Sequence, residues 1–581
     1  MNPHASKRIE FFLISLLIFL GFLILFVLKG IDDNSLTSWL WTFSSFNIVE
    51  FSLIIIFGMI FAYMLTRLSL LRVVSTFPRF SPSVFLFLLS FISVMPFWKV
   101  PEVIVDASRY FTQAKHLEVY GIGYFLREWG RDINIWTDMP LIPFLYGLIF
   151  KLFGESRIYI QAFTTLLFSL TVVLTYNIGK TLWDETVGFY GGLLLLGIPY
   201  LFSQIPLMLV DVPAMFFLTL SIFTFIMALN RGGIWLLFSS VAVFTAFFSK
   251  YSTWPMLSIL AVIFVVYSVQ RSKLKMQDAG YRMQDNHASW RRGFVVVLIS
   301  GILIGVVFWY KSDVFLNQIK LLLNYQQPGL KRWGESFIST FFFQIHPFIT
   351  AAAIYSAYAA FKKKDLKYLI IIWLIFLIAV LQIKRIRYII MIFPLLTLMA
   401  SYGLQEIKDK RIVRFIVSCT VVFSLLIAVL AYFPFLRKTS AANIKNAGSF
   451  LNSLDASEIE VFTLQAKNHD VNPAVSVPIL DMFTEKKIRY YYDASSFLPF
   501  SGAEKSPLRF TWEYKNPKYY IGGNGKGDAN IKKAVVVITE SSEQLIPSEI
   551  RQKVMGYRNS AIFKISEGVF QYQTIVRVYY D

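Results

Sequence analysis

Charged side chains interrupt or border long apolar runs at three places in this sequence. The first is Asp106, a few residues past the end of an apolar run, and the second is Asp211, in the stretch SQIPLMLVDVPAMFF. The third is a set of cations in short polar breaks: Lys250, Lys384, Arg385 and Arg387. An ionisable group in apolar surroundings is costly unless it is paired, so each place is a candidate functional site.

The residue types suggest what chemistry these places could perform. A partly desolvated carboxylate near water can act as a general base, which suits Asp106, although a lone acid in a loop is more often merely solvated. Asp211 equally fits an N-cap for a helix that begins at Val212. The clustered cations need a counter-charge, and a lipid-borne phosphate would supply it; snorkelling side chains are the alternative.

The elements that position these residues must be formed by the long apolar runs. Of the 581 residues, 56% are hydrophobic and 17% are aromatic, which is more apolar surface than a soluble core absorbs. Runs of about 17 to 25 residues have the length of membrane-spanning helices. We predict about thirteen spans, at 10–29, 46–66, 82–99, 157–178, 186–204, 212–229, 233–249, 252–268, 293–311, 337–360, 367–383, 388–404 and 413–434.

The charges in the loops predict an orientation. With a cytoplasmic N-terminus, the loops assigned to the cytoplasm are all basic, as the positive-inside rule requires. Segment 140–153 is apolar but too short to span, so we expect it to lie on the membrane. The loop YQQPGLKRWGES, with Lys331 and Arg332, is predicted to be a solvated outer loop. The tail 436–581 then lies outside the cell membrane.

Other function classes lose support. The net charge of +20 lies in short loops between apolar runs, so it indicates topology rather than nucleic-acid binding. The single cysteine, Cys419, excludes a disulfide framework. No Walker A loop, GxGxxG turn or HExxH helix is present.

The tail is a different kind of chain. Helix-like stretches at 441–454, 479–487 and 547–557 alternate with β-rich ones at 460–464, 488–492, 534–539 and 575–580. About 145 residues suffice for one small α/β domain. We therefore predict three parts: two N-terminal helices (1–80), a membrane domain (81–435) with a first outer loop at 100–156, and the tail (436–581).

The order of these features resembles the GT-C fold glycosyltransferases, specifically the group of protein O-mannosyltransferases and lipid A aminoarabinose transferases. The resemblance covers roughly residues 97–404. Its first outer loop matches at Asp106, Ala107, Ser108, Arg109 and Tyr110, followed by Asp138, Met139, Pro140 and Leu141. Later matches are Arg157, the turn Gly179 to Leu182, Asp211, Ser249 with Lys250, and Arg387 with Tyr388 and Pro394.

The resemblance implies an inverting transfer of a sugar from a polyprenyl-phosphate carrier to an acceptor on the non-cytoplasmic face. Asp106 would be the general base, with Asp211 as a second catalytic residue. The donor phosphate would be held by Lys250, Lys384, Arg385 and Arg387, and the substrates would be contacted by Arg109, Tyr110, Asp138 and Tyr388. The family's Glu after the first Asp is Ala107 here, and its Lys before the Pro pair is Met139, so the acceptor chemistry and part of the phosphate grip differ.

Two rivals from other classes stay open. One is a transporter that flips a polyprenyl-linked glycan, although the sequence shows no duplicated halves. The other is a non-catalytic scaffold that presents the tail to a partner. The partners expected for the enzyme are the donor lipid, an acceptor glycan, lipid or protein, and the bilayer, without nucleic acid. No protein metal site is predicted, and a divalent cation as cofactor is left open.

Overall fold

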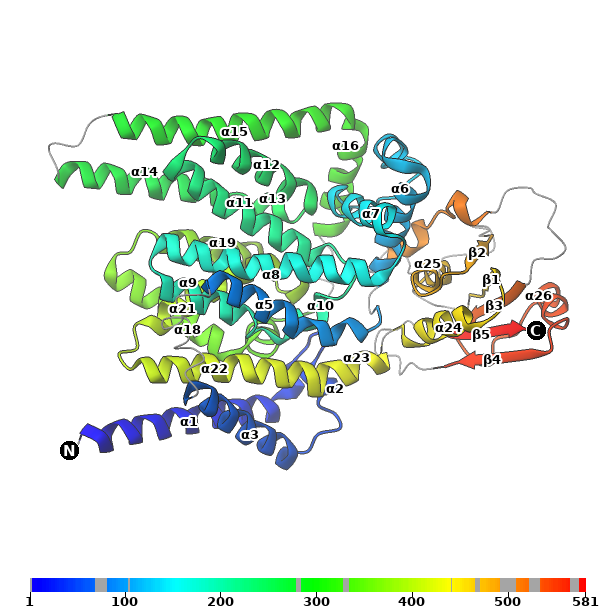
Figure 1. The fold of residues 1–581 in the computed structure, drawn as a ribbon, viewed down its shortest axis with the longest axis horizontal. Helices are drawn as coiled ribbons and strands as arrows, with labels where there is room; N and C mark the ends of the chain where they lie inside the picture. Colours follow the sequence, from blue (N-terminus) through cyan, green and yellow to red (C-terminus); the bar gives the residue numbers. More distant parts are fainter. Residues whose placement is uncertain are drawn as a thin grey trace. The chain divides into compact units, whose positions relative to one another are not determined.

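A computed structural model describes residues 3–67, 81–102, 105–277, 284–327, 334–439, 441–465, 471–491, 508–521, 533–564 and 574–581 (Figure 1). The chain forms two compact units. The first, which we call the helical unit, comprises Met1–Phe97, Thr164–Ile205 and Val210–Phe433. The second, the sheet unit, comprises Trp98–Phe163, Pro206–Leu209 and Pro434–Asp581.

Within the described residues, nine helical segments are long and apolar enough to cross a membrane. They overlap α1 (Pro3–Val27), α3 (Ile48–Arg67), α5 (Pro82–Val94), α8 (Arg157–Leu182), α11 (Asp211–Arg231), α14 (Ile259–Gln277), α15 (Gln284–Tyr310), α21 (Phe393–Gln405) and α22 (Lys410–Leu426). The prediction of a polytopic helical membrane protein is therefore confirmed.

The remaining four predicted spans are also helical, but they are short or interrupted. They correspond to α9 (Glu185–Leu195) with α10 (Pro199–Gln204), α12 (Ile234–Ser249), η4 (Ser339–Ile345) with α18 (Pro347–Lys363), and α19 (Tyr368–Leu381). Proline explains both interruptions, because Pro199 and Pro347 each begin a new helix and cannot continue the preceding one. His346 is the N-cap of α18, so it lies at the boundary between the two helices.

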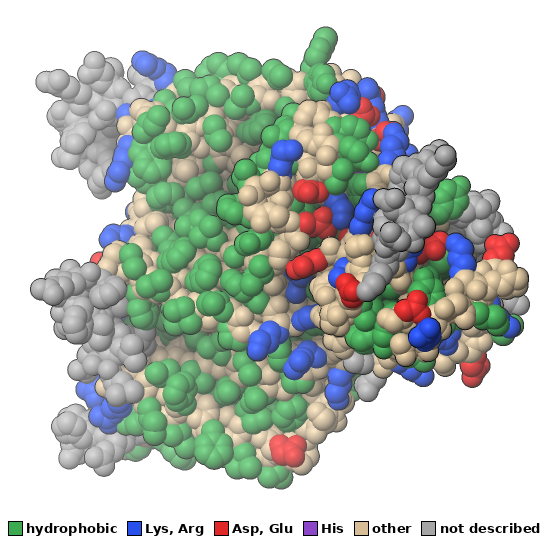
Figure 2. All heavy atoms as spheres, turned by 45° about the vertical axis from the view of Figure 1, so that its right-hand side comes forward, with side chains coloured by type: hydrophobic (Ala, Val, Ile, Leu, Met, Phe, Trp, Pro, Cys, Tyr) green, Lys and Arg blue, Asp and Glu red, His purple; other side chains and the backbone are tan. Residues whose placement is uncertain are grey.

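The helices expose apolar side chains, as expected for surfaces that meet lipid. Phe12 on α1, Phe57 on α3 and Val306 on α15 are each about two-thirds exposed, at 65, 66 and 64%. Figure 2 shows hydrophobic side chains covering much of the visible face of the helical part. So much exposed apolar surface is unfavourable in water and requires a bilayer around it. The chain is therefore an integral membrane protein.

Two spans are more enclosed than the others. In α11, 83% of the apolar window is buried, and in the segment Ile386–Gln405, which contains α20 (Ile386–Ile389) and α21, 89% is buried. These two spans carry Asp211 and Arg387 at their beginnings. The predicted charged residues therefore stand at the ends of the interior helices of the unit.

The sheet unit is built on a mixed five-stranded sheet with the order β2-β1-β3-β5-β4. The strands are β1 (Glu458–Thr463), β2 (Lys487–Tyr490), β3 (Lys533–Thr539), β4 (Asn559–Phe563) and β5 (Ile575–Tyr580). β1 pairs in parallel with β2 and β3, whereas β5 pairs antiparallel with β3 and β4. Ile459, Val536 and Val578 supply buried side chains to one face of the sheet, as the period-two pattern of these strands requires.

The predicted tail elements agree with this sheet except in two details. Helices α24 (Ala442–Ser453) and α26 (Ser548–Val554) lie where helices were predicted. The predicted helix at 479–487 is instead α25 (Ser476–Asp481), and β2 begins at Lys487. β4 was not predicted, since its exposed face breaks the apolar alternation.

The first loop belongs to the same unit as the tail. Its helices α6 (Asp106–Glu128) and α7 (Leu141–Phe153) pack so closely that a Cβ on Gly147 would lie 2.7 Å from the Ala114 carbonyl oxygen. Lys115 Nζ of α6 contacts Asp481 Oδ2 of α25 at 2.6 Å and Glu155 Oε1 at 3.0 Å. The predicted division into three parts at 1–80, 81–435 and 436–581 differs from these two compact units and remains a proposal.

Candidate functional site

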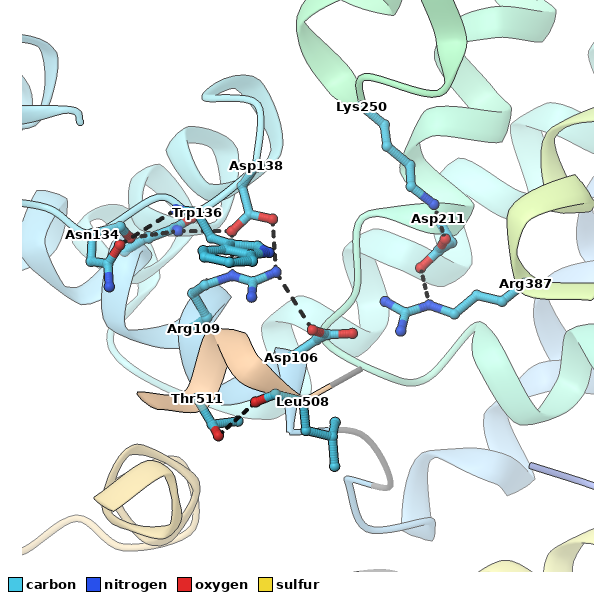
Figure 3. Close-up of polar contacts among 11 residues, drawn as sticks. Asp106, Arg109, Asn134, Trp136, Asp138, Asp211, Lys250, Arg387, Leu508 and Thr511 are labelled. Atoms are coloured by element: carbon cyan, nitrogen blue, oxygen red, sulfur yellow. Dashed lines mark hydrogen bonds and ion pairs between the residues drawn. The ribbon is translucent and has the colours of Figure 1, made fainter. Parts of the chain in front are cut away.

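The helical unit brings three of the predicted residues together around one carboxylate. Asp211 is the first residue of α11, Lys250 directly follows α12, and Arg387 lies in α20. Lys250 Nζ pairs with Asp211 Oδ1, and Arg387 Nε donates to Asp211 Oδ2 at 3.0 Å (Figure 3). All three side chains are buried. We call these residues the Asp211 cluster.

A second ion pair lies beside this cluster in the chain. Arg385 Nε is 3.6 Å from Glu335 Oε1, and the backbone N–H of Ile386 donates to Glu335 Oε2 at 3.2 Å. Ser35 Oγ donates to Glu335 Oε1 at 3.2 Å. Burial raises the pKa of Glu335, and the Arg385 guanidinium opposes that rise. Glu335 belongs to the loop that was predicted to be solvated. That prediction is wrong for Glu335, which is buried in the helical unit. Lys331 and Arg332 of the same loop lie outside the described residues.

The remaining predicted residues of this group are placed differently. The Tyr388 ring lies 5.6 Å from Lys250 Nζ and 5.4 Å from the guanidinium carbon of Arg385, so it links the two ion pairs. Lys384 is exposed, with Nζ 5.9 Å from the Phe337 ring centroid. Lys384 therefore lies at the edge of the group, whereas Arg385 and Arg387 are inside it.

Buried cations are concentrated among these side chains. Lys250, Arg385 and Arg387 are three buried cations, and they share the Asp211 and Glu335 carboxylates. A buried cation is expensive unless anionic groups compensate its charge. Guanidinium and ammonium groups are the usual partners of phosphate in proteins. This part of the helical unit can therefore bind an anion.

A tyrosine that the sequence did not suggest lies near these charges. Tyr200 of α10 is fully buried, and its hydroxyl has no hydrogen-bond partner among the described residues. The hydroxyl is within electrostatic reach of Glu335, Arg385, Arg387 and Asp211. In the sequence it stands in the apolar stretch GIPYLFSQ, where a tyrosine looks like an ordinary packing residue.

The sheet unit holds the other predicted residues. Asp106 is the first residue of α6, and Arg109 Nη2 lies 3.5 Å from its Oδ1. The same guanidinium pairs with Asp138 in two-point contact, Nε to Oδ2 at 2.5 Å and Nη2 to Oδ1 at 2.9 Å. Figure 3 shows Arg109 between the two carboxylates. Tyr110 is buried, with its ring centroid 5.4 Å from the guanidinium carbon.

The surroundings of Arg109 keep it charged and fixed. Although burial opposes its charge, the Asp138 and Asp106 carboxylates hold the pKa of Arg109 above its ordinary value. Burial raises the pKa of Asp138, and Arg109 and the Gln113 amide, which donates at 3.0 Å, oppose that rise. A bidentate pair of this kind fixes the orientation of both groups. Arg109 in turn restrains the Asp106 side chain at the beginning of α6.

Comparison with solved structures identifies the fold. The apo structure of ArnT from Cupriavidus metallidurans matches with a TM-score of 0.51 over 85% of this chain and 97% of that chain, at 11% identity. The structure of the same protein bound to undecaprenyl phosphate matches with a TM-score of 0.50 and 12% identity over the same shares. The chain has the GT-C fold.

The family comparison agrees with this fold. Residues 138–280 match the model of the dolichyl-phosphate-mannose-protein mannosyltransferases, a segment that contains Asp138, Asp211 and Lys250. No curated protein sequence matches the chain significantly. The resemblance to GT-C fold glycosyltransferases predicted from the sequence is confirmed by the matching segment and by the fold.

Proposed function

We propose that this GT-C protein is a glycosyltransferase that takes a sugar from a polyprenyl-phosphate carrier and passes it to an acceptor on the non-cytoplasmic face of the membrane. The observation that carries the proposal is the cluster of three buried cations, Lys250, Arg385 and Arg387, around Asp211 and Glu335. A lipid phosphate is an anion that can reach such a place from within the bilayer. The ArnT structure with undecaprenyl phosphate supports the choice of this ligand class.

The donor phosphate would contact Lys250, Arg385 and Arg387, with Lys384 at the edge. Asp211 holds Lys250 and Arg387 from one side, so both cations are oriented before the phosphate arrives. Tyr388, close to Lys250 and Arg385, would line the same region. Cations fixed in advance stabilise the charge that develops on a leaving phosphate, and removing one such group typically lowers the rate by about 10²–10³-fold.

The proposed transfer inverts the anomeric carbon in one step. The acceptor hydroxyl gives its proton to the Asp106 carboxylate while its oxygen forms a bond to C1 of the sugar. The bond between C1 and the phosphate oxygen breaks, and the electron pair leaves with the polyprenyl phosphate. Arg109 and Asp138 would orient Asp106 and contact the acceptor. Because Ala107 replaces the family's Glu, Asp106 acts without an adjacent carboxylate.

The decisive experiment uses the full-length protein in lipid with a panel of radiolabelled polyprenyl-phosphate sugars. The wild type is expected to move label from one carrier to an acceptor. Asp106→Asn should lower transfer by about 10²-fold or more, because general-base catalysis is removed, and should leave donor binding intact. Asp455→Asn, which changes an exposed acid of the sheet unit, serves as the matched control.

Other outcomes identify the rival functions. A transporter would move the labelled carrier across the bilayer with its sugar still attached. A scaffold would give no transfer with any donor and no response to Asp106→Asn. Either result would overturn the proposed enzyme.

A further inference from the structure

A pocket in the sheet unit lies between the first loop and the tail. α6 supplies Ser108, Arg109 and Thr112, and the tail supplies Phe510, Thr511 and Tyr514. The tail residues lie on or beside the helical turn η10 (Arg509–Glu513). Asn134 of the first loop also contacts this turn, because its side-chain amide donates to the Glu513 carbonyl. The pocket is therefore built jointly by segments about 400 residues apart in the chain.

One hydrogen-bond donor of this pocket has no acceptor. Arg109 uses Nε and Nη2 for the two carboxylates, but the buried Nη1 has no hydrogen-bond partner among the described residues. The guanidinium carbon lies 4.5 Å from the Phe510 ring centroid, so Arg109 and Phe510 of the tail together form one wall of the pocket. Figure 3 shows the turn with Thr511 beside Arg109. A buried N–H without an acceptor is costly, which favours a ligand oxygen at this position.

The charges around the pocket argue against an anionic ligand. Arg109 with Asp106 and Asp138 sums to −1, because one cation faces two carboxylates. The other charged lining residues, Lys515 and Asp132, cancel. The Thr112 and Thr511 hydroxyls already donate to the carbonyls of Ser108 and Leu508, so the site offers the Arg109 N–H as a donor and hydroxyl oxygens as acceptors. These groups exert no net attraction on a phosphate or a carboxylate. An uncharged, hydroxyl-rich ligand fits these groups better.

The lining also limits the size of the ligand. Hydroxyl side chains and the aromatic rings of Phe510 and Tyr514 both line the pocket, a combination that suits a sugar ring with one polar edge and one apolar face. The cavity volume of about 40 Å³ is room for about three water molecules at roughly 10–15 Å³ each. The pocket can therefore accept the edge of one sugar ring, with two or three hydroxyls, rather than enclose a whole sugar.

We propose that this pocket binds one uncharged pyranose unit of the acceptor, which makes the acceptor a glycan and the tail a part of its recognition. The inference rests on the proposed function for its place in the reaction, since Arg109 joins the pocket to the proposed base Asp106. The binding itself needs neither donor nor transfer. Phe510 and Thr511 then determine which acceptor the enzyme selects.

The test measures sugar binding directly. The full-length protein in lipid nanodiscs is titrated with methyl pyranosides of the common hexoses, and binding is followed by saturation-transfer NMR. At least one pyranoside is expected to bind the wild type. Phe510→Ala should weaken that binding about two- to twelvefold, the range that follows from losing one aromatic contact. Phe563→Ala makes the same change elsewhere in the sheet unit, where Phe563 packs on Phe450, and should leave binding unchanged.

Ser108→Ala is the second variant, because it removes a pocket hydroxyl with little change in packing, and it should weaken binding by a smaller factor. The inference is overturned if no pyranoside binds the wild type, if both Phe variants bind alike, or if inorganic phosphate displaces the sugar. Transfer in the radiolabel assay decides the proposed function separately. If the wild type transfers sugar but Phe510→Ala binds the pyranoside as well as the wild type does, the inference about the pocket fails and the proposed enzymatic function stands.

Discussion

Single side chains in this protein are arranged around shared charges. The Asp211 carboxylate serves two cations, and the Arg109 guanidinium serves two carboxylates. In each case the central group fixes its neighbours, so a change at the centre alters several side chains at once. Residues at the edge, such as Tyr200, are better probes of a single interaction.

Tyr200→Phe is expected to separate binding from folding. The hydroxyl is buried without a hydrogen-bond partner among the described residues, so its removal should leave the melting temperature unchanged or raise it. If the hydroxyl donates to the donor phosphate, affinity for undecaprenyl phosphate should fall about tenfold or more, as for other hydrogen bonds to charged groups. Affinity is measured by titration of the protein in nanodiscs, and stability by thermal unfolding.

Tyr432→Phe is the matched control, because the Tyr432 hydroxyl donates to Gln344 Oε1 at 3.1 Å in the buried interior. It should lower the melting temperature and leave undecaprenyl phosphate affinity unchanged. If Tyr200→Phe behaves as Tyr432→Phe does, the Tyr200 hydroxyl has a structural role only.

Sequence could reveal the charged residues but not their partners. Lys250 and Arg387 stand out because cations interrupt apolar runs, and Asp211 stands out in the same way. Glu335 and Tyr200 do not, because a glutamate in a polar loop and a tyrosine in an apolar run are both ordinary. Their importance comes from contacts with residues up to 300 positions away, such as Ser35 with Glu335, which no local pattern encodes.

At the scale of elements, one ion cluster joins three segments of the sheet unit. Lys115 of α6 lies between Asp481 of α25 and Glu155, which follows α7, and the Tyr520 hydroxyl donates to Asp481 Oδ2 at 2.6 Å. Burial raises the pKa of Glu155 to about 7; Asp481 adds to the rise and Lys115 opposes it. The cluster therefore changes its charge near neutral pH.

This shift predicts a pH dependence of stability. The folded-state pKa of Glu155 lies above its ordinary value, so between pH 4.5 and about 7 the folded protein holds more protons than the unfolded one. The contribution of Glu155 to stability should accordingly fall as pH rises through that window. Glu155→Gln removes the titration, and its melting temperature should decline less than that of the wild type between pH 5 and 8. Glu485→Gln, an exposed glutamate of the same unit, should follow the wild type. If the melting temperature of Glu155→Gln depends on pH in the same way as that of the wild type, Glu155 is not the group that titrates.

The elements themselves were largely predictable, because length and apolar content decide which segments can cross a membrane. The interruptions at Pro199 and Pro347 were harder, since a helix broken inside an apolar run has the composition of an intact span. The strand β4 was missed for the opposite reason, because its pattern of exposure is irregular.

At the scale of the molecule, the charge of the loops predicts which face of the membrane each part occupies. The tail is predicted outside and the loop with Lys362 inside, and orientation is best measured chemically. Cys419 is buried, so introduced cysteines can be labelled selectively. In intact cells, a membrane-impermeant thiol reagent should label Met555→Cys in the tail, where Met555 is 73% exposed, and should not label Lys362→Cys until the cells are opened. The reverse pattern would invert the proposed topology.

The composition of the sheet unit has a consequence for how the protein is made. Trp98–Phe163 shares its compact unit with Pro434–Asp581, so the early segment leaves the ribosome 418 residues before the last residue of that unit. At about 5–20 residues per second, that interval is roughly 20–80 s. Until α25 is made, α6 lacks the helix that packs against it, and this stage of synthesis is exposed to misfolding and to the action of chaperones.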